Sequence, residues 1–165
     1  MKIVRSSIAL LLLSATSVLA ESPSEGFTVA KMTFESIDAD GDGLLSPNEM
    51  TMFGESIFLG MDYDKNSQVA FDEFEEWDIG FGTAAEAEGG ADAMKIANRI
   101  LFGFWDRDKD GAITMDEFNE AGAFDFERAD VNGDQMLNPR EYLLGYSVNI
   151  VMRGAIRPDI DVSAR

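Results

Sequence analysis

Acidic residues recur at a fixed spacing in four twelve-residue stretches, which begin at residues 38, 62, 106 and 130. Each stretch opens with Asp, has Asp or Asn at its third and fifth positions, and closes with Glu. Carboxylate and amide oxygens at these positions are ligands that suit a single hard cation. The spacing therefore predicts four sites for an ion such as calcium, magnesium or manganese. We call the stretches loops 1 to 4.

The loops resemble the twelve-residue calcium loop of the EF-hand, which implies ligands at positions 1, 3, 5, 7 and 12, with position 7 contributing its backbone carbonyl. These candidate ligands are Asp38, Asp40, Asp42, Leu44 and Glu49 in loop 1; Asp62, Asp64, Asn66, Gln68 and Glu73 in loop 2; Asp106, Asp108, Asp110, Ala112 and Glu117 in loop 3; and Asp130, Asn132, Asp134, Met136 and Glu141 in loop 4. A bidentate Glu at position 12 favours seven oxygen ligands, which calcium accepts and octahedral magnesium does not. We therefore expect calcium at three or four of these loops.

Apolar residues repeat in the same frame, although metal binding does not require them. A phenylalanine stands four residues before each first Asp, at Phe34, Phe58, Phe102 and Phe126. Position 8 is always aliphatic, with Leu45, Val69, Ile113 and Leu137. Aliphatic and β-branched residues suit a short strand through which two loops pair. An acidic surface turn arising by chance would not carry this frame.

These loops resemble the calcium-binding loops of the EF-hand superfamily, of which the calmodulin-like proteins are familiar members. The resemblance covers roughly residues 27–150 and, given the export signal described below, is closest to exported bacterial EF-hand proteins. It implies an all-α fold of four helix–loop–helix units packed in pairs, with short β pairing between loops. It also implies calcium at the ligand positions named above.

Two loops depart from the family pattern. Position 6, where the backbone adopts positive φ, is Gly43 in loop 1 and Gly111 in loop 3, but Ser67 in loop 2 and Gln135 in loop 4. A residue other than glycine costs about 1–2 kcal/mol there. Loops 2 and 4 also carry three carboxylates instead of four, and Ala70 gives loop 2 no side-chain oxygen at position 9. We therefore rank affinity as loops 1 and 3, then 4, then 2; an empty, structural loop 2 is the alternative.

The loop spacing divides the chain into two similar halves. Loop starts are 24 residues apart within each half (38 to 62, and 106 to 130) and 68 apart between halves (38 to 106), which indicates a duplication. Only twelve residues separate the two loops of each half, and an unbroken helix of that length would hold them about 18 Å apart. Gly54 and Gly122 occupy matching places in these connections, so we expect a bend at each.

Such bends would let the two loops of each half pair back to back. Position 8 would then set the partners: Leu45 opposite Val69, and Ile113 opposite Leu137. The predicted organisation is an EF-hand pair over residues 27–80, a small, glycine-rich linker over 81–92, a second EF-hand pair over 93–152, and a loose tail over 153–165.

Residues 1–20 have the pattern of a secretory signal peptide. Lys2 and Arg5 precede an apolar run from Ile8 to Ala20, which ends in small residues suited to cleavage. The run is shorter than the approximately 20 residues that cross a bilayer, although an uncleaved anchor is the alternative. We predict cleavage after Ala20, a periplasmic or secreted location, and no membrane insertion.

Composition narrows the possible functions further. The chain has 31 acidic and 13 basic residues and a net charge of −18, which argues against nucleic acids and anionic membranes as partners. It contains no histidine and no cysteine, which excludes histidine-based acid–base catalysis, cysteine nucleophiles, disulfides and the usual zinc ligands. We therefore expect no enzymatic activity. Calcium would stabilise the folded chain in place of disulfides.

These features favour an exported calcium-binding protein that acts as a sensor or a buffer. The eight methionines beyond the predicted cleavage site and the twelve phenylalanines would line a groove exposed by calcium in a sensor, or fill the core of a small helical protein. The alternative function is a structural module whose calcium holds the fold while it docks to an envelope protein or peptide. Calcium-dependent exposure of apolar surface would separate the sensor from the other two.

Overall fold

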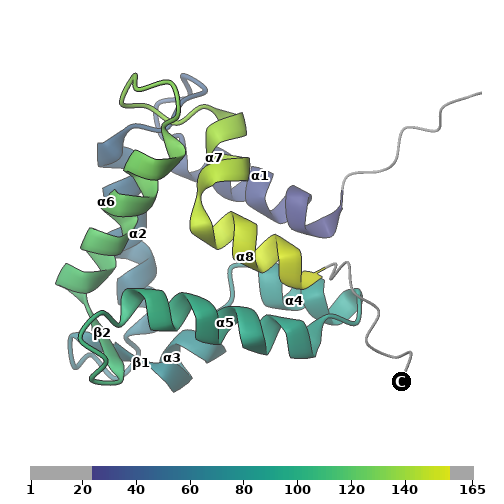
Figure 1. The fold of residues 1–165 in the computed structure, drawn as a ribbon, viewed down its shortest axis with the longest axis vertical. Coiled ribbons are helices and arrows are strands. Elements are labelled where there is room, and N and C mark those ends of the chain that lie inside the picture. Colours follow the sequence, from purple (N-terminus) through teal and green to yellow (C-terminus); the bar gives the residue numbers. More distant parts are fainter. Residues whose placement is uncertain (1–23, 157–165) are drawn as a thin grey trace, which may run out of the picture.

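The computed structural model describes residues 24–156, so the predicted signal peptide and the tail beyond Ile156 lie outside the described residues. The described elements are α1 (Glu25–Ile37), α2 (Pro47–Met61), β1 (Gln68–Ala70), α3 (Phe71–Glu76), α4 (Phe81–Ala87), α5 (Ala91–Trp105), β2 (Ala112–Thr114), α6 (Met115–Ala129), α7 (Pro139–Gly145) and α8 (Ser147–Ile156). The predicted all-α class with short β pairing is confirmed (Figure 1). No helix in this part of the chain is long and apolar enough to cross a bilayer.

Helices that leave the loops begin at capping residues visible in the sequence. The side chains of Ser46, Thr114 and Asn138 each accept a hydrogen bond from the backbone N–H three residues on, where a Glu closes the loop. That Glu returns the bond by accepting the backbone N–H of the capping residue, which completes a capping box. Ala70 has no side-chain oxygen, so only Glu73 contributes at the start of α3, through a 2.9 Å bond from the Ala70 N–H.

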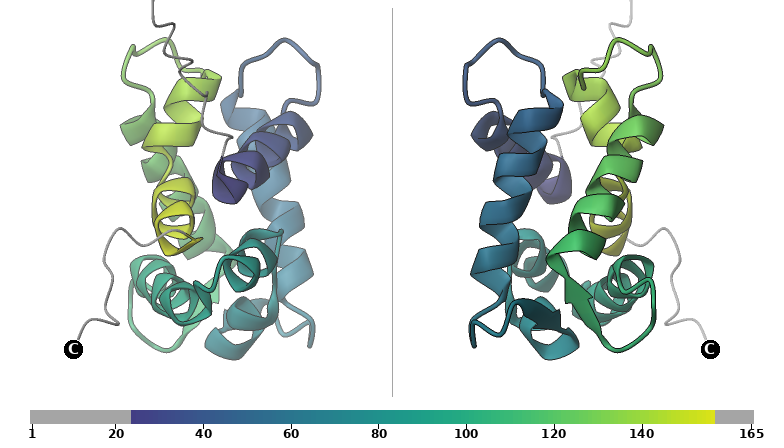
Figure 2. Two further views of the ribbon diagram at one scale, coloured as in Figure 1. Left: turned by 90° about the vertical axis from the view of Figure 1, so that its right-hand side faces the viewer. Right: turned by 90° about the vertical axis from the view of Figure 1, so that its left-hand side faces the viewer.

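The connections that we expected to bend at Gly54 and Gly122 are unbroken helices. α2 and α6 each run for 15 residues, and they lie side by side between the two ends of the protein (Figure 2). A Cβ atom at Gly54 would lie 3.2 Å from Cε1 of Phe118, and one at Gly122 would lie 3.7 Å from the hydroxyl oxygen of Tyr146. These glycines therefore allow other side chains to approach the helices closely. The predicted bends are wrong.

Because α2 and α6 are continuous, they place the two loops of each half at opposite ends of the molecule (Figure 2). At one end β1 of loop 2 pairs antiparallel with β2 of loop 3, with Val69 opposite Ile113. At the other end Leu45 of loop 1 forms an isolated antiparallel bridge with Leu137 of loop 4. The expected pairing of Leu45 with Val69 and of Ile113 with Leu137 is therefore wrong. A 15-residue helix is about 22 Å long, too long for the loops at its two ends to meet.

Two hydrophobic clusters lie beneath the two loop pairs. The cluster under loops 1 and 4 includes Phe34, Leu45, Phe126, Leu137 and Tyr142. The cluster under loops 2 and 3 includes Phe58, Val69, Phe74, Phe102 and Ile113. The four aliphatic residues at position 8 are all fully buried, and the four repeated phenylalanines are at most 9% exposed. The apolar frame repeated in the sequence therefore forms the core.

The segment 81–92, which we expected to be a linker, contains α4 and contributes to the first cluster. Phe81 and Ala85 are buried, and α4 packs against α1 and α8. The Asp78 carboxylate fixes the start of this helix by accepting the backbone N–H groups of Gly82 and Thr83 at 2.8 and 2.9 Å. We expected the small residues of this segment to form a linker. Instead they allow α4 to pack closely against its neighbouring helices.

Candidate metal centres

All four loops adopt the same hydrogen-bonded frame. The Asp at position 1 accepts the backbone N–H of position 6 in every loop, at 3.0, 3.0, 3.1 and 2.9 Å in loops 1 to 4. The side chains at positions 3 and 5 accept the N–H groups of positions 5 and 7 in every loop. These bonds orient the predicted ligand oxygens within each loop. Loops 2 and 4 therefore share the hydrogen-bonded frame of loops 1 and 3.

The closing Glu joins the two ends of its loop through both carboxylate oxygens. In loop 1, Oε1 of Glu49 accepts the backbone N–H of Ala39 at 2.9 Å, while Oε2 accepts the backbone N–H of Ser46 at 2.8 Å. Hydrogen bonds of this kind, first from the Ser46 backbone, hold the pKa of Glu49 below its ordinary value of 4.5. The pKa of Glu117 is lowered in the same way, first by the backbone of Thr114. Both carboxylates are therefore charged at neutral pH and suited to a cation.

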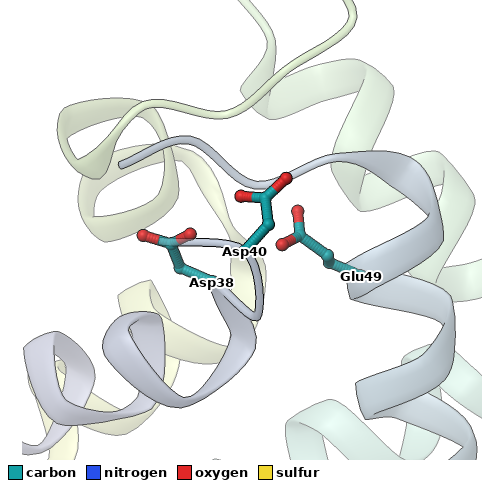
Figure 3. A group of neighbouring side chains, drawn as sticks. All are labelled: Asp38, Asp40 and Glu49. Atoms are coloured by element: carbon teal, nitrogen blue, oxygen red, sulfur yellow. The ribbon is translucent and has the colours of Figure 1, made fainter. Parts of the chain in front are cut away.

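Three loops bring the carboxylates of positions 1, 3 and 12 together. The groups are Asp38, Asp40 and Glu49 (Figure 3); Asp62, Asp64 and Glu73; and Asp106, Asp108 and Glu117. Within each group, one oxygen from each residue lies within 4.8 Å of the others. The side chains at position 5 (Asp42, Asn66, Asp110 and Asp134) lie outside these groups and accept the N–H of position 7. Among the described residues, loop 4 forms no such trio of carboxylates, and its position 3 is Asn132.

The surroundings of one buried carboxylate oxygen indicate whether these groups suit a cation. Asp106 is only 8% exposed, and its Oδ2 accepts the backbone N–H of Gly111 at 3.1 Å. Its Oδ1 is buried and has no hydrogen-bond partner in the described part of the chain. An unpaired buried carboxylate oxygen is unfavourable, and a cation beside it would remove that cost. The ligand set consists of hard oxygens, which suit calcium, magnesium or manganese. The residues therefore fit the ion that the loop pattern predicts.

Comparison with known proteins agrees with this geometry. A family model described as EF hand matches residues 29–53 and 99–121, which contain loops 1 and 3. The chain belongs to the EF-hand superfamily. EF-hand domains are a calcium-binding, non-catalytic fold, and the acidic groups are placed to hold such an ion. The comparison with curated proteins gives no match.

Loops 2 and 4, which lie outside the matched segments, are those without glycine at position 6. Ser67 and Gln135 nevertheless take the same left-handed conformation as the glycines, with φ of 68° and 65°. This conformation is unfavourable by about 1–2 kcal/mol for each of them, because both have a side chain. In this conformation the backbone N–H groups of Ser67 and Gln135 still donate hydrogen bonds to the Asp at position 1 of their loops.

A second left-handed position in the four loops was not predicted from the sequence. Position 4 also has positive φ, and in loops 2 and 3 it is occupied by Lys65 and Lys109, with φ of 61° and 63°. The signal was present in the sequence, because the same position is Gly41 in loop 1 and Gly133 in loop 4. Each loop therefore has two left-handed residues, and loop 2 has no glycine at either.

Proposed function

We propose that this protein is exported and binds calcium at all four EF-hand loops, as a sensor or a buffer. The observation that carries this is the hydrogen-bonded frame shared by the four loops. Calcium would be held by the residues at positions 1, 3, 5, 7 and 12 of each loop. Loops 2 and 4 are each paired by backbone hydrogen bonds with a loop that the family model matches, which supports binding at all four.

Export is supported by the pattern of residues 1–20. The chain recovered from the periplasm or the medium should begin at Glu21 and lack the preceding residues. Intact-mass measurement of that material checks this, and a mass that still includes Met1–Ala20 would contradict it.

Calorimetric titration of the exported chain with calcium tests the number of sites. We expect three or four calcium ions per chain, with dissociation constants of about micromolar to sub-millimolar, and weaker binding of magnesium. A stoichiometry of two or fewer would show that loops 2 and 4 do not bind.

A structural module with constitutively bound calcium is the second candidate. It is favoured by the position of both hydrophobic clusters, because the fully buried Leu45 and Ile113 belong to the loops themselves. Loss of calcium would then loosen the core. The methionines support neither role alone, since Met61 and Met94 are buried whereas Met32 and Met52 are exposed.

Dye binding with and without calcium separates these roles. A sensor should expose more apolar surface with calcium than without it while both forms stay folded. A structural module should lose its helical circular dichroism when calcium is removed, and a buffer should show neither change. We expect no catalytic activity in any of these cases, which agrees with the non-catalytic nature of the family.

A further inference from the structure

A cavity of about 630 Å³ lies where the two hydrophobic clusters meet. Helices α2, α5, α6 and α8, which surround the centre of the molecule in Figure 1, provide most of its wall. The wall is mainly apolar and draws on both halves of the chain, with Ile57, Trp105, Phe118, Val148 and Met152 among its residues. No residue of the three carboxylate groups lines the cavity, whereas Asp130 and Gln135 of loop 4 do.

Glycines on the two central helices, α2 and α6, help to create this space because they have no side chain. Gly54 of α2 and Gly122 of α6 both line the cavity. Only the Tyr146 hydroxyl, at 3.7 Å, lies near the position that a Cβ atom of Gly122 would take. A larger side chain at residue 122 would therefore extend into open space within the cavity.

The size of the cavity suits a small molecule better than a peptide helix. Ligand-binding cavities in proteins span about 300–1,000 Å³. A ten-residue helix 15 Å long and 10 Å wide would occupy about 1,200 Å³, nearly twice the space available. The lining also contains Trp77, Trp105 and Tyr146, whose aromatic rings suit an apolar or cationic ligand.

The charged residues that line the cavity favour one sign of charge on the ligand. Glu75, Glu86 and Glu127 are exposed residues of the lining, and none of their side-chain carboxylates has a hydrogen bond or an ion pair with the described residues. The one basic residue of the lining, Lys95, lies 3.6 Å from Asp92. Together these rim charges repel a carboxylate ligand and attract a cation.

We propose that this cavity binds a small amphipathic cation, with its apolar body between α2, α5, α6 and α8 and its charged head at the rim, to which Glu75, Glu86 and Glu127 each contribute a carboxylate. The Tyr146 hydroxyl, which has no hydrogen-bond partner among the described residues, is available to a polar atom of the ligand. Burial raises the pKa of Tyr146, so this hydroxyl stays neutral and can donate a hydrogen bond. The proposal does not rest on calcium binding, although the cavity borders loop 4.

Fluorescence of N-phenyl-1-naphthylamine, a neutral apolar reporter, tests the site in the calcium-saturated chain. The reporter should bind saturably at one molecule per chain and accept energy from Trp77 and Trp105. Dodecyltrimethylammonium should displace it at a concentration at least tenfold lower than dodecanoate, with both kept below their micelle concentrations. Failure to bind saturably, or displacement by dodecanoate at an equal or lower concentration, would overturn the proposal.

Two leucine variants separate the cavity from the rest of the surface. Gly122→Leu should fill the cavity and weaken reporter binding at least tenfold. Gly103→Leu makes the same change on α5, where no atom lies within 4 Å of the added Cβ, and should bind as the wild type does. If Gly122→Leu loses its calcium stoichiometry, Ile57→Trp on the neighbouring helix replaces it. Unchanged reporter binding in a folded cavity variant would place the reporter elsewhere and overturn the proposal.

Discussion

Leu45 and Leu137 exchange two backbone hydrogen bonds of 2.9 Å each, although they belong to opposite halves of the sequence. Val69 and Ile113 are paired in the corresponding way at the other end. Each end of the protein therefore takes one loop from each half. Because α2 joins loops 1 and 2 and α6 joins loops 3 and 4, the four loops form a closed ring in which every loop contacts one partner and shares one helix with another.

Substitution of Glu49 should reveal which loops are coupled. Glu49→Gln removes a charged predicted ligand of loop 1 and should also weaken calcium binding at loop 4, because Leu45 and Leu137 join these loops. We expect an effect on loop 4 of about tenfold, within the range of 5–150-fold typical of coupling between sites. Calcium titrations followed by the NMR signals of the Gly133 and Ser67 amides report on loops 4 and 2 separately.

Glu55→Gln is the matched control for this substitution. Glu55 lies on the same helix, is exposed, and is not a predicted ligand, so it should leave all four affinities within twofold of the wild type. A Glu49→Gln variant that weakens loop 2 more than loop 4 would show that the shared helix, and not the bridge, carries the coupling.

Truncation of a position-8 side chain should destabilise the fold. Leu45 is fully buried, so Leu45→Ala should lower the free energy of unfolding by about 3 kcal/mol, as typical leucine truncations do. Leu59→Ala removes the same atoms from a side chain that is 67% exposed, and should change stability by less than about 0.5 kcal/mol. Guanidinium denaturation at saturating calcium compares the two, and equal losses would contradict the assigned core.

Two glycines should respond to alanine in opposite directions. Gly103 is an exposed residue of α5 with open space around it, so Gly103→Ala should stabilise the protein by about 0.5–1 kcal/mol. A Cβ at Gly145 would lie 2.9 Å from the Cα of Ala129, so Gly145→Ala should cost about 1–3 kcal/mol. Thermal unfolding of both variants checks this; a gain from Gly145→Ala would mean that α6 and α7 pack less closely than they do here.

Asp125 connects α6 to the start of α8 and is only 5% exposed. Its carboxylate accepts hydrogen bonds from the Ser147 hydroxyl and, at 2.9 Å, from the Arg128 guanidinium. Burial is the largest influence and raises the pKa of Asp125 above its ordinary 3.8, while Ser147 and Arg128 oppose the rise. Folding therefore favours the neutral form of this carboxyl group.

The raised pKa of Asp125 predicts a pH-dependent effect of Asp125→Asn. The stabilising contribution of the neutral carboxyl is fully present below pH 3.8 and is lost as the pH rises through the higher folded-state pKa. The uncharged Asn does not undergo this loss. The free energy of unfolding of the variant, minus that of the wild type, should therefore increase with pH across this window and then level off. Denaturant titrations from pH 4 to 7 measure it, and a difference independent of pH would refute it.

Local features of the fold could be predicted from the sequence because they depend on short-range spacing. The loop frame, the caps at Ser46 and Thr114 and the burial of Leu45 all follow from residues within one loop. The choice of partner could not be predicted, since the four position-8 residues are all aliphatic and any two could pair. The partner depends on whether α2 and α6 continue through Gly54 and Gly122. A glycine costs only about 1 kcal/mol within a helix, which packing along the helix outweighs.

The paired contacts have a consequence for how the molecule could arise. A shift of 68 residues along the sequence takes Val69 to Leu137 and Leu45 to Ile113. If the two halves of the sequence exchange places, the Val69–Ile113 pair therefore becomes the Leu137–Leu45 pair, and the reverse also holds. Such self-complementary contacts are those of an isologous twofold homodimer. A half-length ancestor could have made the same contacts with a second copy of itself, but only at sufficient concentration. Fusion of the two copies keeps the partner attached, so that the assembled state no longer depends on dilution.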